Sequence, residues 1–251
     1  MSNIVWNSTD FSALGLVTPG VAGVHDLIPV VRSRQFLPGS SMPCDTITRD
    51  HDLGRLALSC VVAGTSHADL VSRLAAIKKA GSPRAALATH GWAHLSIEGM
   101  TGKRTYATPD AFPVAIDALP YLTTVVEFGW DWTRVGWWED ATATTATDPA
   151  SINNTGDLAT WPLYTCTVSG TLAGGLTFTV NGKTLEYTGA LVATDVLVID
   201  PEAMTCTLNG TEDMANVAAD TDWPELVTGA NAVSKSSADF TLDVTYRRRW
   251  E

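Results

Sequence analysis

The Asn181-Gly182 pair lies between two short runs of alternating apolar and polar residues, and it strongly restricts how the second half of the chain can fold. Both residues tolerate the positive φ of a type I′ turn, so the pair predicts a two-residue β-hairpin. The pairs that this loop brings together on one face are Val180 with Lys183, Phe178 with Leu185, and Leu176 with Tyr187. Because this face is almost wholly apolar, we expect a second sheet to bury it.

The same period of two recurs elsewhere in this half of the chain. Shorter alternating runs surround Cys166 and Cys206. The final run is the clearest, and its inward-pointing residues are Phe240, Leu242, Val244 and Tyr246. At least five short strands without a helix predict a β-sandwich or barrel.

One amphipathic helix is expected in the first half. Ser66 can cap it, Asp69 suits the first turn, and Gly81 ends it after about four turns. The apolar residues that share one face are Leu70, Leu74 and Ile77. Alternating runs on either side predict strands at residues 55–62, near Leu95 and Ile97, around Thr105-Tyr106 after a turn at 98–102, and at 121–132. The predicted fold class is therefore mainly β with one helix.

Charge divides the 251 residues into two parts. Residues 1–138 hold 11 acidic and 11 basic side chains, whereas residues 139–251 hold 16 and 5 and carry the whole net charge of −11. Such an acidic chain is a poor partner for nucleic acid, whose phosphates must be neutralised by cations. Small polar residues at 141–155 predict a linker or long surface connection. We expect domains at 1–145 and 146–251.

The first residues lack the basic and apolar regions of a secretion signal, and no run approaches the roughly 18 apolar residues of a membrane span. We therefore expect a soluble protein made in the cytoplasm. The four cysteines form no C-x-x-C pair, which favours free, buried thiols over a zinc or redox site.

Residue patterns for catalysis or cofactor binding are weak. His90 and His94 have the spacing of helical metal ligands, but Gly91 and the neighbouring strand pattern disfavour a helix. The adjacent acids Glu139-Asp140 and Glu212-Asp213 do not fit a glycosidase, whose two carboxylates face each other across a cleft. We expect no catalytic residues, no metal and no cofactor.

Aromatic and basic clusters offer candidate contact sites. One cluster consists of Trp130, Trp132, Trp137 and Trp138. These side chains either pack in the core or form an exposed patch that contacts another subunit or a sugar. Trp161 and Trp223 are candidates for core or edge packing, with ligand stacking as the alternative. The basic run Arg247, Arg248 and Arg249 is either a partner contact or a solvated strand end.

The order of motifs resembles the distal tail protein (Dit) family of long-tailed bacteriophages. In the first half, the stretches that carry this resemblance are Phe36-Leu37-Pro38-Gly39-Ser40 and residues 55–66, followed by the single helix. In the second half they are Asn154-Thr155-Gly156-Asp157, Asn181-Gly182, residues 195–200, Leu208-Asn209-Gly210, Trp223-Pro224-Glu225-Leu226, Gly229-Ala230-Asn231 and residues 244–249. The resemblance covers nearly the whole chain.

The resemblance implies a structural role at the distal end of the virion tail. It implies an N-terminal belt domain that closes a homo-hexameric ring and a C-terminal galectin-like β-sandwich. The implied partners are the tail tube protein, the baseplate hub or tail-associated protein, the tape measure protein, and receptor-binding or side-fibre proteins. Alternatives are a carbohydrate-binding sandwich that uses Trp161 or Trp223 in host-surface adsorption, and an enzyme such as a glycoside hydrolase.

Overall fold

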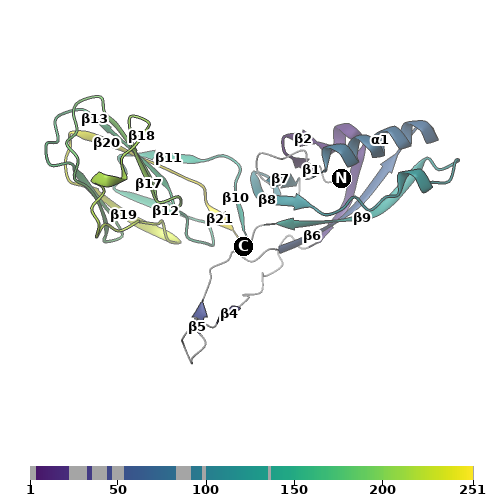
Figure 1. The fold of residues 1–251 in the computed structure, drawn as a ribbon, viewed down its shortest axis with the longest axis horizontal. Helices are drawn as coiled ribbons and strands as arrows, with labels where there is room; N and C mark the ends of the chain where they lie inside the picture. The colour runs from purple at the N-terminus through teal and green to yellow at the C-terminus, as the bar shows by residue number, and fades with distance from the viewer. Residues whose placement is uncertain are drawn as a thin grey trace. The chain divides into compact units, whose positions relative to one another are not determined.

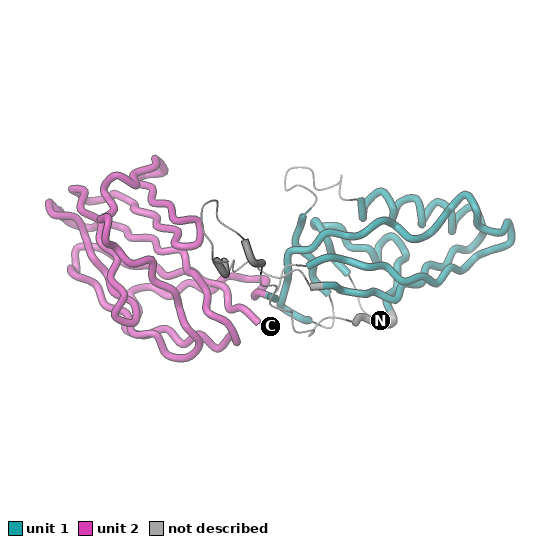
Figure 2. Tube along the Cα trace, turned by 60° about the horizontal axis from the view of Figure 1, so that its bottom comes forward, with its two compact units in different colours: residues 1–138, 251 teal, residues 139–250 magenta. Residues whose placement is uncertain are grey.

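The computed structural model describes residues 4–22, 33–35, 44–46, 54–82, 92–97, 100–134 and 137–250. The chain divides into two compact units, residues 1–138 with Glu251 and residues 139–250 (Figures 1 and 2). We call these the first and second units. The prediction of a mainly β fold with one α-helix is confirmed for the residues described. None of the helices in those residues is long and apolar enough to cross a membrane.

The first unit is built on one antiparallel sheet with the strand order β2-β1-β7-β8-β9-β6-β3. These strands are β1 (Ile4–Trp6), β2 (Thr9–Asp10), β3 (Leu16–Ala22), β6 (Gly54–Ala63), β7 (Ala93–Ile97), β8 (Lys103–Pro109) and β9 (Val125–Arg134). Strands β4 (Ser33–Gln35) and β5 (Cys44–Thr46) form a separate pair. Two short 3-10 helices, η1 (Phe11–Leu14) and η4 (Ile116–Ala118), complete the unit. Strands β6 and β9 pair along ten residues each, and theirs is the longest strand pairing of the sheet.

The alternation predicted for β6 is confirmed, since Leu56, Leu58, Cys60 and Val62 are buried and Arg55, Ala57 and Ser59 are exposed. The alternation expected at 121–132 holds only in part. Trp130 and Trp132 are buried, but Leu122 precedes β9 and is 88% exposed. The alternating pattern identifies the residues that share one face of a strand. It does not show how far along the strand that face is buried.

Helix α1 (His67–Ala80) begins and ends where the sequence predicts. The Ser66 hydroxyl accepts a hydrogen bond from the Asp69 amide at 3.2 Å, which caps the first turn. Leu70, Leu74 and Ile77 are fully buried. At the other end the Gly81 amide donates to the Ile77 carbonyl at 2.8 Å. Gly81 has an ordinary φ of −86°, and it is needed there because a Cβ would lie 2.1 Å from Cη2 of Trp130.

The second unit is a sandwich of two antiparallel sheets, with orders β11-β20-β13-β16-β17-β18 and β12-β19-β14-β15. The strands of the larger sheet are β11 (Thr144–Thr147), β13 (Leu163–Val168), β16 (Val196–Asp200), β17 (Thr205–Leu208), β18 (Thr211–Glu212) and β20 (Phe240–Tyr246). Those of the smaller sheet are β12 (Ser151–Asn154), β14 (Leu176–Val180), β15 (Lys183–Tyr187) and β19 (Gly229–Lys235). Strand β10 (Trp138–Asp140) pairs with β21 (Arg249–Trp250), and a short 3-10 helix, η5, spans Met214–Asn216.

The core of the sandwich lies between its two sheets, as the apolar strand faces predict. Tyr164, Phe178, Leu197 and Leu242 are each at most 1% exposed and belong to one continuous cluster. The hairpin of β14 and β15 has the predicted register, with φ values of 52° at Asn181 and 80° at Gly182. On its outer face the hydroxyls of Thr179 and Thr184 lie 2.9 Å apart in a hydrogen bond.

The expected linker at 141–155 is instead built into the sandwich. Strand β11 pairs with β20, and β12 pairs with β19. Between these strands Asp148 has φ 45°, and its Oδ1 accepts hydrogen bonds from the Leu242 amide at 2.8 Å and from Nζ of Lys235 at 2.6 Å. The linker interpretation was wrong because threonine-rich edge strands have few apolar side chains, although their β-branched residues favour strands.

Candidate functional site

Three tryptophans of the predicted aromatic cluster are core residues of the first unit. Trp130, Trp132 and Trp138 are 1%, 0% and 0% exposed. The ring centroids of Trp130 and Trp132 lie 4.9 Å apart, and Trp6 meets Trp132 edge to face at 5.6 Å. Nε1 of Trp130 donates to the Asp110 carbonyl at 3.1 Å, so this indole has the hydrogen bond that a buried indole requires.

Trp130 and Trp132 lie on β9, inside the sheet, and all three side chains are buried within their own chain, which agrees with the core alternative. Their role in a subunit contact stays a prediction. Trp137 is half-buried, and its carbonyl accepts a hydrogen bond from the Thr105 hydroxyl at 2.9 Å. For Trp137 the contact stays a prediction.

Three exposed apolar side chains in the described part of the first unit lie close together in sequence, just before and at the start of β9. Tyr121 is 84% exposed, Leu122 88% and Val125 50%. We call these three residues the Tyr121 group. Sequence reasoning placed them in a strand pattern and missed them as a surface feature. The signal was available, because a Tyr-Leu pair directly after Pro120 and before the strand has few neighbours to bury it.

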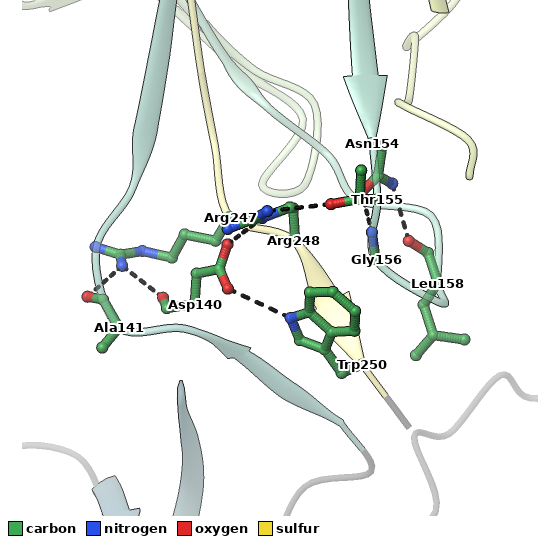
Figure 3. A network of polar contacts seen from close by, with 9 residues as sticks. All are labelled: Asp140, Ala141, Asn154, Thr155, Gly156, Leu158, Arg247, Arg248 and Trp250. Atoms are coloured by element: carbon green, nitrogen blue, oxygen red, sulfur yellow. Dashed lines mark hydrogen bonds and ion pairs between the residues drawn. The ribbon is translucent and has the colours of Figure 1, made fainter. Parts of the chain in front are cut away.

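The first two residues of the arginine run, Arg247 and Arg248, form internal contacts of the second unit (Figure 3). Nε of Arg248 lies 2.5 Å from Oδ2 of Asp140, and Nε1 of Trp250 donates to the other carboxylate oxygen at 3.3 Å. Arg247 donates from Nη1 to the carbonyls of Asp140 and Ala141. We call this set the Asp140 clamp. It joins the first strand of the unit, β10, to the last, β21, so the run is not a solvated strand end.

Arg249 is the most buried of the three arginines, with a side chain 7% exposed. Its Nη2 donates to Oε1 of Glu202 at 2.6 Å, and its guanidinium lies over the Trp161 ring at 5.5 Å from the centroid. Its carbonyl accepts from the amides of Asp157 and Leu158. The contact of these arginines with another protein stays a prediction.

Three asparagines of the motifs that resemble the Dit family form hydrogen bonds within the second unit: Asn154, Asn181 and Asn231. Nδ2 of Asn154 donates to the carbonyls of Leu158 and Leu226, at 3.0 and 3.2 Å. The Asn231 amide group donates to three backbone carbonyls. Asn181 joins it through a side-chain hydrogen bond of 2.5 Å. Buried polar groups in a sandwich must be paired, and these asparagines satisfy backbone groups where strands end.

The residues described here do not assemble catalytic or metal-binding chemistry. They contain no group of three His, Cys, Asp or Glu side chains placed to hold a metal ion. His94 meets Tyr106 edge to face with ring centroids 4.1 Å apart, while His90 lies outside the described residues. Asp140 belongs to the clamp, and Asp213 accepts a hydrogen bond from the Tyr187 hydroxyl.

Three of the four cysteines have side chains that the structure describes, and the side chain of Cys44 lies outside them. Cys60, Cys166 and Cys206 are free and buried, as predicted. Burial raises the pKa of Cys60 and Cys166 to about 12 and that of Cys206 to about 11, so all three stay protonated at neutral pH.

One pocket of about 290 Å³ lies within the second unit. Trp161, Leu163 and Tyr246 form its apolar part, and Glu202 and Arg249 are among its charged residues. Trp223, the other tryptophan considered for ligand stacking, packs instead against the core of the sandwich.

Comparison with known proteins agrees with this architecture. Residues 155–250 match the sequence model of the family described as siphovirus-type tail component, C-terminal domain. No curated protein matches the chain in sequence. The crystal structure of Dit (gp 19.1) of phage SPP1, described as a paradigm of the hub adsorption apparatus in phages that infect Gram-positive bacteria, is similar over 100% of both chains, with a TM-score of 0.75 and 12% identity.

A chain from the structure of the phage P2 baseplate in its activated conformation with Ca is similar over 98% of both chains. Its TM-score is 0.40 and its identity 7%, and a likeness this distant supports no argument. The family match of residues 155–250 and the fold shared with SPP1 Dit agree with the expected resemblance. Residues 155–250 thus match the C-terminal domain family of siphovirus-type tail components, and the whole chain has a fold similar to that of SPP1 Dit.

Proposed function

We propose that this protein is the subunit of a homo-hexameric ring at the distal end of the tail, which joins the tail tube to the baseplate hub. The observation that carries the proposal is the shared fold with SPP1 Dit over the entire chain, together with the family match of the second unit. SPP1 Dit is described as a paradigm of a hub adsorption apparatus, and a hub needs a subunit that contacts both its own copies and other proteins.

In this proposal the first unit closes the ring. Residues 1–138 sum to zero formal charge, so copies can pack together without strong mutual repulsion. The Tyr121 group supports this role, because closely spaced exposed apolar side chains mark protein contact sites. We propose the Tyr121 group as part of the contact between neighbouring copies.

The second unit is proposed as the platform to which host-recognition components attach. Residues 139–251 carry the whole net charge of −11, which keeps a peripheral domain solvated. The proposed partners of the ring are the tail tube protein, the hub protein, the tape measure protein, and receptor-binding or side-fibre proteins.

Native mass spectrometry of the purified full chain, followed by pull-down with the tail tube and hub proteins of the same phage, tests the proposal. We expect a hexamer that retains both partners. A chain that stays monomeric across the accessible concentrations and retains neither partner would contradict it. A ring with another number of subunits would correct the proposed stoichiometry. The pull-down would then decide whether that ring joins the tail tube to the hub.

A further inference from the structure

One side of the sandwich ends in two edge strands. In the part of the chain that the structure describes, β11 is the outermost strand of the larger sheet and β12 that of the smaller one. Only residues 148–150 connect these two strands, so both lie at the same side of the sandwich. An edge strand presents a row of backbone N–H and C=O groups that its own sheet does not use. These groups form a surface to which a further strand can pair.

The register of β11 shows which of its backbone groups face outward. The Asp148 amide donates to the Leu242 carbonyl at 2.8 Å, in line with the pairing of β11 and β20. Because hydrogen-bonded pairs alternate along an antiparallel ladder, Ala146 also bonds to β20, whereas the amides and carbonyls of Thr145 and Thr147 point away from the sheet. Both threonines are exposed. We call their four outward backbone groups the β11 edge.

The opposite side of the sandwich is covered by the chain itself. On β15 the Thr184 carbonyl accepts a hydrogen bond from the Asp222 amide at 2.9 Å, and the Glu186 carbonyl accepts one from the Ala218 amide at 3.0 Å. The Glu186 amide donates to the Thr221 hydroxyl at 2.6 Å. Strand β18, at this side of the larger sheet, is only two residues long. The β15 edge is therefore closed to another strand.

Other edges carry features that discourage pairing. Strand β3 of the first unit contains Pro19 and a register shift between Val17 and Gly20. By the same alternation, the outward residues of β12 are Ser151 and Asn153, and asparagine is depleted in strands. Strand β11 has neither proline, charge nor a register shift, and threonine favours strands. Proteins usually protect an edge with such devices, so their absence from β11 favours an edge that is used.

Charge defines the kind of strand that fits. All five basic side chains of residues 139–251 are engaged within the second unit. Their contacts are the ion pairs Lys183–Glu225, Lys235–Asp148, Arg248–Asp140 and Arg249–Glu202, and the hydrogen bonds from Arg247 to two carbonyls. The same residues hold 16 acidic side chains. One of them, Asp243, accepts a hydrogen bond from the Thr147 hydroxyl beside the β11 edge. This surface therefore attracts a basic strand and repels an acidic one.

An apolar opening lies at the end of β11. It has a volume of about 190 Å³, and its lining includes Pro149, Ala150, Val233 and Leu242. Asp148, which directly follows β11, also lines it. Side-chain pockets beside a sheet edge give specificity when a strand is added, because the backbone hydrogen bonds alone are the same for any sequence. An apolar side chain on the inward face of the added strand suits this opening.

We propose that β11 accepts an extended, basic strand of another tail protein, which hydrogen-bonds to Thr145 and Thr147 and extends the larger sheet. A second copy of this chain is a poorer occupant, because pairing of β11 with itself joins only two copies and cannot close a ring. The inference rests on the platform role proposed above and specifies how the platform holds a partner.

Hydrogen–deuterium exchange at single-residue resolution on the full chain tests this proposal. The probe is the acetylated and amidated peptide Leu-Lys-Thr-Val-Thr-Lys-Leu, whose leucines and lysines lie on opposite faces of a strand. The comparison peptide has glutamate in place of both lysines. In the free chain we expect fast exchange of the Thr145 and Thr147 amides and slow exchange of the Ala146 amide. The basic peptide should slow exchange at both threonines, and added salt should weaken its binding.

Two variants at one position separate backbone pairing from side-chain effects. Thr145→Pro removes an N–H that the sheet does not use and places a ring toward the incoming strand. Thr145→Val keeps this N–H and, like proline, loses the hydroxyl contact with Thr245. Fluorescence anisotropy of the labelled basic peptide should show at least about tenfold weaker binding to Thr145→Pro than to Thr145→Val. Ser151→Pro, which blocks β12 in the same way, should bind as the parent does.

Thermal melting verifies that each variant remains folded, and if Thr145→Pro unfolds, exchange in the parent decides. The proposal is overturned if the basic peptide leaves Thr145 and Thr147 unprotected, if the acidic peptide binds equally well, or if Ser151→Pro rather than Thr145→Pro loses binding. Protection that grows with the concentration of the chain alone would assign the edge to a second copy and equally overturn it. A chain that retains the tail tube and hub proteins but binds no peptide would refute strand addition alone and leave the proposed ring in place.

Discussion

Asp140, in the first strand of the second unit, and Arg248, directly before its last strand, form an ion pair of 2.5 Å. The Asp140 side chain is 12% exposed and also accepts a hydrogen bond from Nε1 of Trp250. A single carboxylate thus bonds to two residues of the C-terminal strand region, 108 and 110 positions away. The second unit is closed by this contact as well as by its hydrophobic core.

Replacing Asp140 with asparagine should destabilise the second unit. The asparagine side chain would keep the shape but remove the charge that faces Arg248, and a half-buried guanidinium without its partner costs about 1–3 kcal/mol. Differential scanning calorimetry of the full chain measures the change. The control is Asp220→Asn at an exposed site, which should stay within about 0.5 kcal/mol of the parent. Equal unfolding temperatures for the two variants would rule out a stabilising clamp.

Asp148 should make the stability of the second unit depend on pH. A hydrogen bond from the Leu242 amide, followed by one from Lys235, lowers the pKa of this carboxyl below its usual value. A lowered folded-state pKa contributes stability above the unfolded value of about 3.9, and this contribution is lost as pH falls through the folded pKa. Asp148→Asn should therefore melt below the parent at neutral pH.

Melting of Asp148→Asn at low pH tests whether the charge of Asp148 causes this difference. The gap between the melting temperatures of the parent and Asp148→Asn should close as the pH falls below about 3.9 and the parent carboxyl becomes protonated. Asparagine also tolerates the positive φ found at this position, so backbone strain should not contribute. A gap that stays constant from neutral to acid pH would show that the charge of Asp148 does not stabilise the fold.

Gly81→Ala should destabilise the first unit although its φ of −86° suits alanine. The added Cβ would lie 2.1 Å from Cη2 of Trp130, which is buried and cannot move away without disturbing its neighbours. Overpacking of this kind costs about 1–3 kcal/mol. Chemical denaturation measures the loss, and near-ultraviolet circular dichroism reports the tryptophan environment.

Gly129→Ala is the matched control for the first unit, because a Cβ there meets nothing within 4 Å and its φ is not positive. It should be neutral or slightly stabilising, since alanine reduces the freedom of the unfolded chain. If both alanine variants unfold alike, close contact with Trp130 does not explain the glycine at position 81.

Leu122→Glu should prevent ring formation without unfolding the subunit. The side chain is 88% exposed, so the change should move the free energy of unfolding by no more than about 0.5 kcal/mol. A charge at the centre of an apolar contact between copies is costly once water is excluded. Native mass spectrometry should show monomers where the parent forms rings, and Val192→Glu in the second unit should assemble normally. Intact rings of Leu122→Glu would exclude the Tyr121 group from the contact.

Local signals predicted individual elements well. The capping serine at position 66 and the apolar spacing after it located α1, and the Asn181-Gly182 turn fixed the register of β14 and β15. In both cases the determining contacts lie within a few residues along the chain. The order of the strands in each sheet was not predictable in this way, because it depends on pairings such as β12 with β19.

The candidate site was less predictable for a related reason. Trp130 and Trp161 are the same residue type, yet one is 1% exposed in a core and the other lines a surface pocket. What distinguishes them is the surrounding structure: β9 lies inside a sheet, whereas Trp161 precedes β13 near a sheet end. Similarly, the arginine run is visible in the sequence as a basic cluster. Its carboxylate partners, Asp140 and Glu202, lie far away along the chain, so the sequence does not reveal them.

The pairing of β10 with β21 has a consequence for how such proteins diversify. A domain whose two ends lie side by side can be exchanged by recombination as a single cassette, because a replacement only has to present two adjacent ends. The Asp140 clamp travels with such a cassette, since both of its sides lie between residues 139 and 250. Selection can then change the outer surface of the second unit without revising the sequence that precedes it.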